Sequence, residues 1–304
     1  MKGQIIMQNS DEVNPIKLSI IIVNYNAEKL LLDCVKSIYN SNNSTALEVI
    51  IVDNDSKDNS RNLITSEYPQ VQWVQNKDNV GFAKANNQAM NIAKGEYIML
   101  LNNDTVVLDK ALDKLVQFLD KNPEAAAVGP RILNKDKTLQ LSCRRGLPNA
   151  VNSFGYFSKL YKVFPNNKAL GGYAMTYISD KISHEVQCLS GAAMVVRKSV
   201  AEKIGGLDEN FFMHFEDVDF CLRIGKLGYK LFYVHDSEII HLKGQSSKLR
   251  SKKVIEDFND SLKYYYKKNY SKEKFFLTNW LVYLAIWARK ILCLAVYNMK
   301  NTSK

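Results

Sequence analysis

Through the first hundred residues, short apolar runs alternate with segments of helical spacing. Residues 18–23 are rich in Ile and Val and precede apolar positions spaced as in a helix over 30–38. Residues 49–52 and 63–64 repeat this order, and 97–101 form a further apolar run. Continuous apolar strands are typical of sheets buried on both faces. The pattern therefore predicts an α/β fold whose mostly parallel sheet is flanked by helices.

The later elements are expected at less regular intervals. We expect a strand at 71–74, a helix from Gly81 to about 93, a strand at 191–196, a helix at 199–204, a helix opening at Glu216, and strands at 230–234 and 239–241. Ser56 is the expected cap of the second helix. Gly95 is expected to adopt a left-handed conformation where the third helix ends.

Two domains are predicted. Residues 1–250 form the first, with an aromatic insert containing Gly and Pro at about 135–185 that covers the acceptor side of the site. Residues 251–304 form a C-terminal helical extension, in which Arg289 and Lys290 interrupt an apolar segment. No uninterrupted apolar run reaches the roughly 20 residues that cross a bilayer. We therefore expect an interfacial helix, the alternative being a helix docked on the domain or on a second subunit of a homodimer.

Composition narrows the class of protein. A chain of 304 residues with 46% apolar content buries a substantial core, and its net charge of +10 suits a nucleic acid, a nucleotide diphosphate or an anionic membrane. Nucleic-acid binding is disfavoured because the aromatics nearest the basic residues lie on the apolar tail. Five scattered cysteines without a Cys-x-x-Cys pair, and residues 1–14 without a signal-like apolar core, favour a cytoplasmic protein.

Polar residues follow the predicted strands at the edge where parallel sheets bind ligands. Asp53 ends the second strand and is placed to accept the N3–H of uracil or thymine, and Asp55 to assist at the ribose. Asn24, Asn26 and Gly81 lie at the same edge and complete the predicted nucleotide site. The alternative is that the two aspartates only shape a turn and cap a helix.

A divalent cation is expected beside the nucleotide. Asp104 follows a buried strand, and hard cations such as Mg²⁺ or Mn²⁺ take oxygen ligands while leaving positions for phosphate. His241, at the end of the last strand, is the candidate second ligand. Taken alone, each of these two residue types is more often structural, so the predicted metal site depends on the fold bringing Asp104 and His241 together.

An acidic pair opens the helix after residue 215. The positive end of the helix dipole could simply stabilise the negative charges of Glu216 and Asp217. A carboxylate there could also accept the proton that an acceptor hydroxyl loses as it attacks a sugar. We assign that role to Asp217 and place Glu216 in the pocket for sugar and acceptor.

Six motifs together give the chain a family resemblance. They are 19–26 (SIIIVNYN), 52–56 (VDNDS), 79–83 (NVGFA), 101–104 (LNND), 189–194 (LSGAAM) and 215–219 (FEDVD). From about residue 18 to 268, the chain resembles the family 2 inverting glycosyltransferases of GT-A fold, most closely their rhamnosyltransferase-like branch. The resemblance implies that Asp53 reads the base, Asp104 and His241 bind the metal, and Asp217 is the catalytic base. It also implies that Gly191 and Ala192 line the sugar pocket.

The chain departs from the family pattern at two places. Asn102 occupies the first acidic position of the metal motif and falls in the predicted sugar pocket, and Gln187-Cys188 replaces an Asp-Trp pair. Neither change removes the metal role, but the second loses an aromatic platform and an acid on the acceptor side.

The function expected from these residues is transfer of a sugar, plausibly rhamnose from dTDP-rhamnose, to a glycan or polyprenyl-linked glycan at the inner face of the cell membrane. UDP-linked galactofuranose, glucose or N-acetylglucosamine is the alternative donor. A non-catalytic sugar-nucleotide-binding subunit is the alternative class. Arg144 and Arg145 would contact acceptor phosphate, against the alternative that they are a solvated charge pair.

Overall fold

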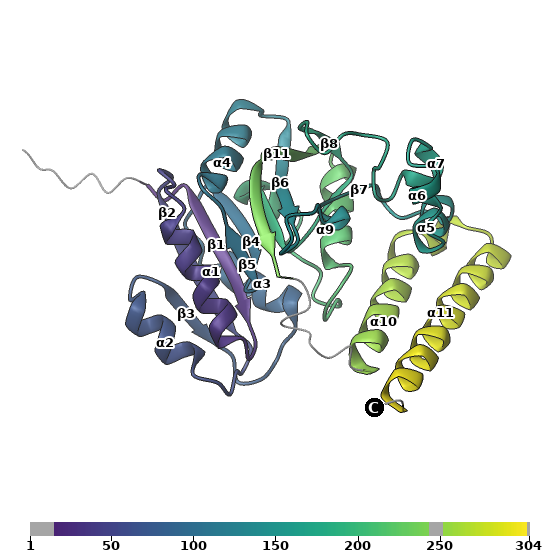
Figure 1. Cartoon of the computed structure of the whole chain (residues 1–304), viewed down its shortest axis with the longest axis horizontal. Coiled ribbons are helices and arrows are strands. Elements are labelled where there is room, and N and C mark those ends of the chain that lie inside the picture. Colours follow the sequence, from purple (N-terminus) through teal and green to yellow (C-terminus); the bar gives the residue numbers. More distant parts are fainter. Residues whose placement is uncertain (1–14, 243–251, 303–304) are drawn as a thin grey trace, which may run out of the picture.

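A computed structural model describes residues 15–242 and 252–302, with side chains described to residue 299. Residues 1–14, expected not to form a secretory signal, and residues 243–251 lie outside the described residues. Figure 1 shows a sheet with helices packed around it and, at the far end, a pair of long helices.

A nine-stranded sheet forms the centre of the described chain, in the order β3-β2-β1-β4-β10-β6-β11-β5, with β8 paired to β11. The strands are β1 Leu18–Asn24, β2 Leu47–Asp53, β3 Gln72–Gln75, β4 Tyr97–Asn102, β5 Thr105–Val107, β6 Ala125–Leu133, β8 His184–Val186, β10 Ala193–Arg197 and β11 Lys230–His241. Only β5, β8 and β10 run against the others. The prediction of a mostly parallel α/β sheet is therefore confirmed.

Helices cover the sheet because its central strands are apolar on both faces. Ile20, Ile21 and Ile22 are fully buried, as are the central residues of β2. The covering helices are α1 Glu28–Asn40, α2 Ser60–Glu67, α3 Phe82–Met90, α4 Ala111–Lys121, α8 Lys198–Lys203 and α9 Glu216–Lys226. Helix α3 packs on β1 and β2, and α4 packs on β6 and β11.

Three local predictions were wrong. The N-cap of α2 is Asn59, because Ser56 instead accepts hydrogen bonds from the backbone N–H of Asn26 and from Asn24. Gly95 does not have a positive φ; a Cβ there would lie 2.5 Å from the backbone N of Ser19, so close packing requires glycine. The two strands expected at 230–241 are one strand, β11, whose register shifts between Val234 and Glu238.

The insert contains short elements rather than a structureless loop. They are the 3-10 turn Leu141–Cys143, the two-stranded sheet of β7 Arg144–Arg145 and β9 Cys188–Leu189, and the helices α5 Ala150–Phe157, α6 Leu160–Val163 and α7 Lys168–Gly171. Asn149 and Asn152 form a reciprocal capping box at the start of α5. These helices lie beside the C-terminal pair in Figure 1.

The C-terminal extension is a helical hairpin. Helix α10, Lys252–Asn269, leads through the 3-10 turn Ser271–Glu273 into α11, Phe276–Thr302, and the two helices pack together. Within α11, Phe276–Met299 is long and apolar enough to cross a membrane by length and composition, which sequence analysis did not expect. Only 6% of its 18-residue window is buried, so α11 is not a core helix.

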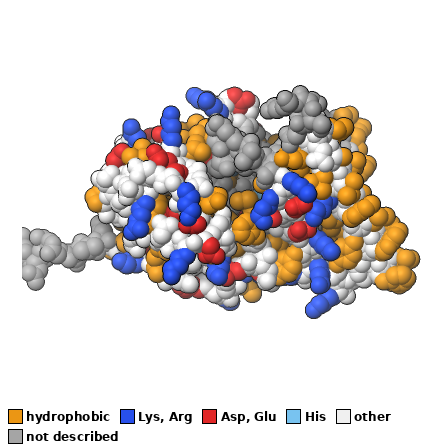
Figure 2. Space-filling model, turned by 90° about the horizontal axis from the view of Figure 1, so that it is seen from below, with side chains coloured by type: hydrophobic (Ala, Val, Ile, Leu, Met, Phe, Trp, Pro, Cys, Tyr) orange, Lys and Arg blue, Asp and Glu red, His pale blue; other side chains and the backbone are white. Residues whose placement is uncertain are grey.

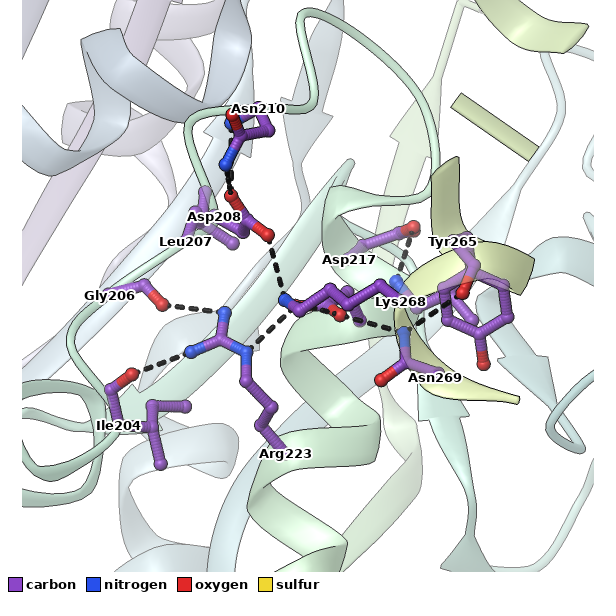
Figure 3. Close-up of polar contacts among 12 residues, drawn as sticks. Ile204, Gly206, Leu207, Asp208, Asn210, Asp217, Arg223, Tyr265, Lys268 and Asn269 are labelled. Carbon is purple, nitrogen blue, oxygen red and sulfur yellow. Dashed lines mark hydrogen bonds and ion pairs between the residues drawn. The ribbon is translucent and has the colours of Figure 1, made fainter. Parts of the chain in front are cut away.

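A polar cluster fastens α10 to α9 (Figure 3). Asp219 is fully buried; it accepts from Arg223 Nε at 2.8 Å, Lys268 Nζ at 2.8 Å and Asn269 Nδ2 at 3.0 Å. Burial alone would raise the pKa of Asp208, but hydrogen bonds from Lys268 and Asn210, together with the charge of Lys268, outweigh burial and hold that pKa at about 2. The end of the hairpin helix is therefore tied to the helix that begins with Glu216.

Candidate active site

Strand register brings the predicted residues to one edge of the sheet. Asn24, at the end of β1, lies opposite Asp53 at the end of β2. Strand β4 pairs with β1 on its other side and ends at Asn102. His241 closes β11 and lies opposite Thr105, directly after Asp104 in the chain. Parallel strands deliver their carboxyl ends to the same edge, and ligands bind there.

Asp53 is only 1% exposed, and three donors hold its carboxylate. Asn24 Nδ2 donates to Oδ2 at 2.9 Å, and Ser56 N and Gln75 Nε2 donate to Oδ1 at 2.8 and 2.7 Å. The carboxylate therefore has a fixed orientation at the end of β2, as a group that reads a base requires.

Left-handed backbone shapes the loops at this edge. Asn26, Asp55 and Gly81 have φ of 48°, 67° and 87°. A Cβ at Gly81 would lie 2.8 Å from the carbonyl oxygen of Phe212, so the close approach requires glycine. Asp55 pairs with Lys57 at 2.6 Å, but that lysine side chain is 76% exposed, so the pair contributes little stability.

Asp104 and His241 meet, as predicted. The Nε2 of His241 lies 3.1 Å from Oδ1 of Asp104, and the side chains are 11% and 6% exposed. The other ring nitrogen, Nδ1, lies 3.0 Å from Gln140 Oε1, while the amide nitrogen of Gln140 donates to the His241 carbonyl at 2.8 Å. Gln140 Oε1 is thus an acceptor for Nδ1–H, and Nε2 is the ring nitrogen that faces Asp104.

This pair fits a divalent cation. One carboxylate oxygen and one imidazole nitrogen converge from two strand ends, and Gln140 supports the imidazole from behind. The described residues hold no cluster of three or more His, Cys, Asp or Glu. Remaining ligands would therefore come from phosphate oxygens and water, as is usual for Mg²⁺ at phosphate sites.

Asp217 lies at the start of α9 with its carboxylate held on several sides. Arg145 Nη2 lies 2.6 Å from Oδ2, and the backbone N–H of Gly191 donates to the same oxygen at 3.1 Å. Val218 N donates to Oδ1 at 2.8 Å. The side chain of Asp217 is 14% exposed, so part of it stays open to solvent while Arg145 supplies its countercharge.

Glu216 is a different kind of acid from its neighbour. It is buried, and its Oε2 has no hydrogen-bond partner among the described residues. Burial, and then the charge of Asp217, raise the pKa of Glu216 to about 8. At neutral pH Glu216 is therefore mostly protonated and can donate a hydrogen bond, whereas Asp217 is held as an acceptor.

The alternative that Arg144 and Arg145 are a solvated pair was wrong, because both are buried. Arg144 donates to the carbonyls of Ile178 and Ser179 at 2.8 and 3.1 Å and so braces the insert. Arg145 instead bonds Asp217. Contact of either arginine with acceptor phosphate stays a prediction.

Hydrogen bonds join the Asp53 end of this edge to Asp217. Asn103 Nδ2 donates to Asn24 Oδ1 at 3.0 Å, which ties β1 to the turn after β4. Asn102 N donates to the carbonyl of Ala192 at 2.9 Å, next to Gly191, whose N–H bonds Asp217. The predicted residues are thus linked through one continuous set of contacts.

Sequence reasoning missed Gln140 and did not foresee the contact that Arg145 makes. Gln140 lies just inside the insert, 101 residues from His241, and only the fold brings them together. Arg145 was predicted as a phosphate contact rather than the partner of Asp217, 72 residues away. The acidic cluster at 216–219 was the one sequence signal that favoured a buried basic partner for Asp217.

The chain belongs to glycosyl transferase family 2, whose family model matches residues 19–205. The fold is that of GT-A glycosyltransferases: a mannosyltransferase from Pyrobaculum calidifontis, solved with GDP-Man and Mn²⁺, superposes with a TM-score of 0.58 at 17% identity, covering 92% of this chain and 72% of that chain.

Two named relatives are similar over about two thirds of the chain. An N-acetylglucosaminyl-diphospho-decaprenol L-rhamnosyltransferase of Mycobacterium tuberculosis is 29% identical over 212 residues, 66% of this chain and 68% of the relative. A low-salt glycan biosynthesis hexosyltransferase of Haloferax volcanii is 27% identical over 212 residues, 68% of this chain and 61% of the relative.

Proposed function

We propose that this family 2 member is a metal-dependent inverting glycosyltransferase that transfers rhamnose from dTDP-rhamnose to a polyprenyl-linked glycan in cell-surface polysaccharide synthesis. The observation that carries the proposal is the orientation of Asp217 by Arg145 and the Gly191 N–H, at the edge that also holds Asp53, Asp104 and His241. The name of the Mycobacterium tuberculosis relative supports the sugar and the acceptor class, and the name of the Haloferax volcanii relative supports sugar transfer in glycan synthesis.

Asp217 acts as the base in this proposal. An acceptor hydroxyl donates its proton to the carboxylate as its oxygen attacks the anomeric carbon, and the nucleoside diphosphate leaves from the opposite face. Arg145 keeps the carboxylate in place, and holding both substrates at fixed positions supplies much of the rate. Because attack is a single displacement, the anomeric configuration inverts.

Other residues bind the donor. Asp53 reads the base, Asn24, Asn26, Asp55 and Gly81 shape the loops around the nucleotide, and a protonated Glu216 donates a hydrogen bond in the sugar pocket. Asp104 and His241 would hold Mg²⁺ or Mn²⁺, which would neutralise charge on the leaving diphosphate.

We place the protein on the cytoplasmic face of the membrane, since a polyprenyl-linked acceptor lies there and the exposed apolar helix α11 supplies a means of attachment.

The decisive test replaces the base. Asp217→Asn should keep donor affinity, measured by calorimetry, and lower turnover by about 100-fold to 10,000-fold, measured as release of nucleoside diphosphate. Asp33→Asn, on the exposed face of α1, is the matched control and should leave turnover unchanged. A panel of dTDP-rhamnose, UDP-galactofuranose, UDP-glucose and UDP-N-acetylglucosamine identifies the donor, and NMR of the product gives its anomeric configuration. Wild-type turnover in Asp217→Asn, or a retained configuration, would contradict the mechanism.

A further inference from the structure

The outward face of α11 is apolar along its length. Large exposed side chains recur three or four residues apart: Leu277, Trp280, Leu284, Trp287 and Ile291. The two tryptophans are each 60% exposed. Hydrophobic side chains gather at this end of the molecule in Figure 2, with lysines and arginines beside them. A continuous apolar patch of this kind marks an interaction surface.

The two charges in the middle of α11, Arg289 and Lys290, point away from this face. Arg289 lies 4.2 Å from the ring centroid of Phe258 and donates to Asn259 Oδ1 at 2.9 Å, and Lys290 lies 3.2 Å from Asp260. All three partners belong to α10. The charges that interrupt the apolar sequence therefore hold the hairpin together and leave the outward face uncharged.

The insert packs against the hairpin and exposes further apolar side chains at this end of the molecule. Arg289 also lies 5.4 Å from the ring centroid of Phe157, which brings α5 against the hairpin. The same insert exposes Phe154, Val163 and Phe164 by 63%, 66% and 52%. Two segments more than a hundred residues apart in sequence thus present apolar side chains at the same end of the molecule.

We propose that α11 and the exposed apolar residues of α5 and α6 form one surface that docks on an anionic lipid bilayer, with α11 lying in the membrane plane. Exposed lysines border it, Lys159 and Lys162 in the insert and Lys272 and Lys274 before α11, and the whole chain carries a net charge of +10. This charge complements anionic headgroups, while Trp and Phe suit the interface between headgroups and acyl chains.

The packing of α10 against α11 excludes a spanning orientation of the intact hairpin. Lys253, Lys263 and Lys267 on α10 are exposed to solvent. If α11 crossed the bilayer with α10 still attached, these lysines would enter hydrocarbon at a cost of about 3 kcal/mol each near the centre. With α11 flat on the membrane, α10 lies on its aqueous side.

Both halves of the surface are attached to the residues of the active site. Arg145 precedes α5 by a few residues and bonds Asp217, while Lys268 and Asn269 of α10 bond Asp219 in the helix that begins with Glu216 (Figure 3). Docking would therefore place the active site next to the lipid surface. Its use in presenting a lipid-linked acceptor rests on the proposed function.

The test uses the full chain and vesicles of phosphatidylcholine, alone or mixed with phosphatidylglycerol, without donor. Wild-type protein should sediment with the anionic vesicles. The double variants Trp280→Ser with Trp287→Ser, and Phe154→Ser with Val163→Ser, should each lower the partition coefficient at least about tenfold. Ile92→Ser, exposed on another part of the molecule, is the control and should bind like wild type.

Three results would overturn the proposal. The first is vesicle binding that departs from the expected pattern: either no preference for anionic vesicles, or loss of binding in only one of the two double variants. The second is protein that resists extraction by alkaline carbonate, which would indicate a spanning helix. The third is a wild-type dimer in sedimentation velocity that the Trp variant converts to monomer while vesicle binding is unchanged. Donor turnover, assayed separately in solution, tests the proposed function independently of these outcomes.

Discussion

The buried carboxylate of Asp219 offers a quantitative test of how the hairpin is held. Arg223 and Lys268 each lie 2.8 Å from it, and at an effective dielectric of about 20 each pair would contribute about 6 kcal/mol before desolvation. Desolvation offsets most of this, so removing one partner of a buried pair costs about 3 to 5 kcal/mol. The cationic side chains are 20% and 28% exposed and can regain water, which favours the lower figure.

We therefore expect Asp219→Asn to lower the free energy of unfolding by about 3 kcal/mol. For a chain of this size that corresponds to a fall in Tm of about 5 °C. The asparagine keeps the shape of the side chain, so the loss reports charge rather than packing. Limited proteolysis should also cut more readily between α10 and α11, because Lys268 loses one of its two acid partners.

The control is Glu202→Gln. This residue pairs with Lys198 at 3.8 Å, and its side chain is 64% exposed, so the change should cost less than about 0.5 kcal/mol. A Tm for Asp219→Asn within about 1 °C of wild type would refute the reasoning, since the carboxylate would then contribute nothing net to stability.

Three further predictions concern the active site. Burial and Asp217 raise the pKa of Glu216 from 4.5 to about 8, so the contribution of Glu216 to stability is complete below pH 4.5 and is lost as the pH rises to 8. Glu216→Gln should therefore flatten the Tm–pH profile over that range. An unchanged profile would count against the raised pKa. Arg145→Met should lower kcat about 100-fold by releasing Asp217, and Arg145→Lys should partly restore kcat, while donor affinity stays unchanged. Equal kcat in wild type and both variants would exclude the positioning role of Arg145. Gln140→Leu should weaken Mn²⁺ binding with nucleoside diphosphate about 10-fold to 100-fold by calorimetry, because His241 loses its support; wild-type affinity would rule that out.

Much of the fold could be predicted because its signals are local. The Ile- and Val-rich run of β1 and the helical spacing after it are properties of a few neighbouring residues. The polar residues that end the strands could be placed at one edge for the same reason. Asp53 and Asp104 lie within a few residues of the strands that position them.

Other predictions failed where a distant part of the chain decided the outcome. Gly95 looked like a helix terminator, but Ser19 packs where its side chain would be. Ser56 looked like a cap, but Asn24 and the Asn26 backbone use its hydroxyl. Arg289 looked like an interruption of an apolar helix, although it packs on Phe258 of α10.

By itself the sequence determined the order of strands and helices and the types of residue that end them, because periodicity and turn chemistry act over short distances. Only the tertiary structure decided which partner each buried charge has: Arg145 for Asp217, and Lys268 and Arg223 for Asp219. A charge that leaves water needs a partner within hydrogen-bond reach. Which residue reaches it depends on how strands and helices pack, not on distance along the chain.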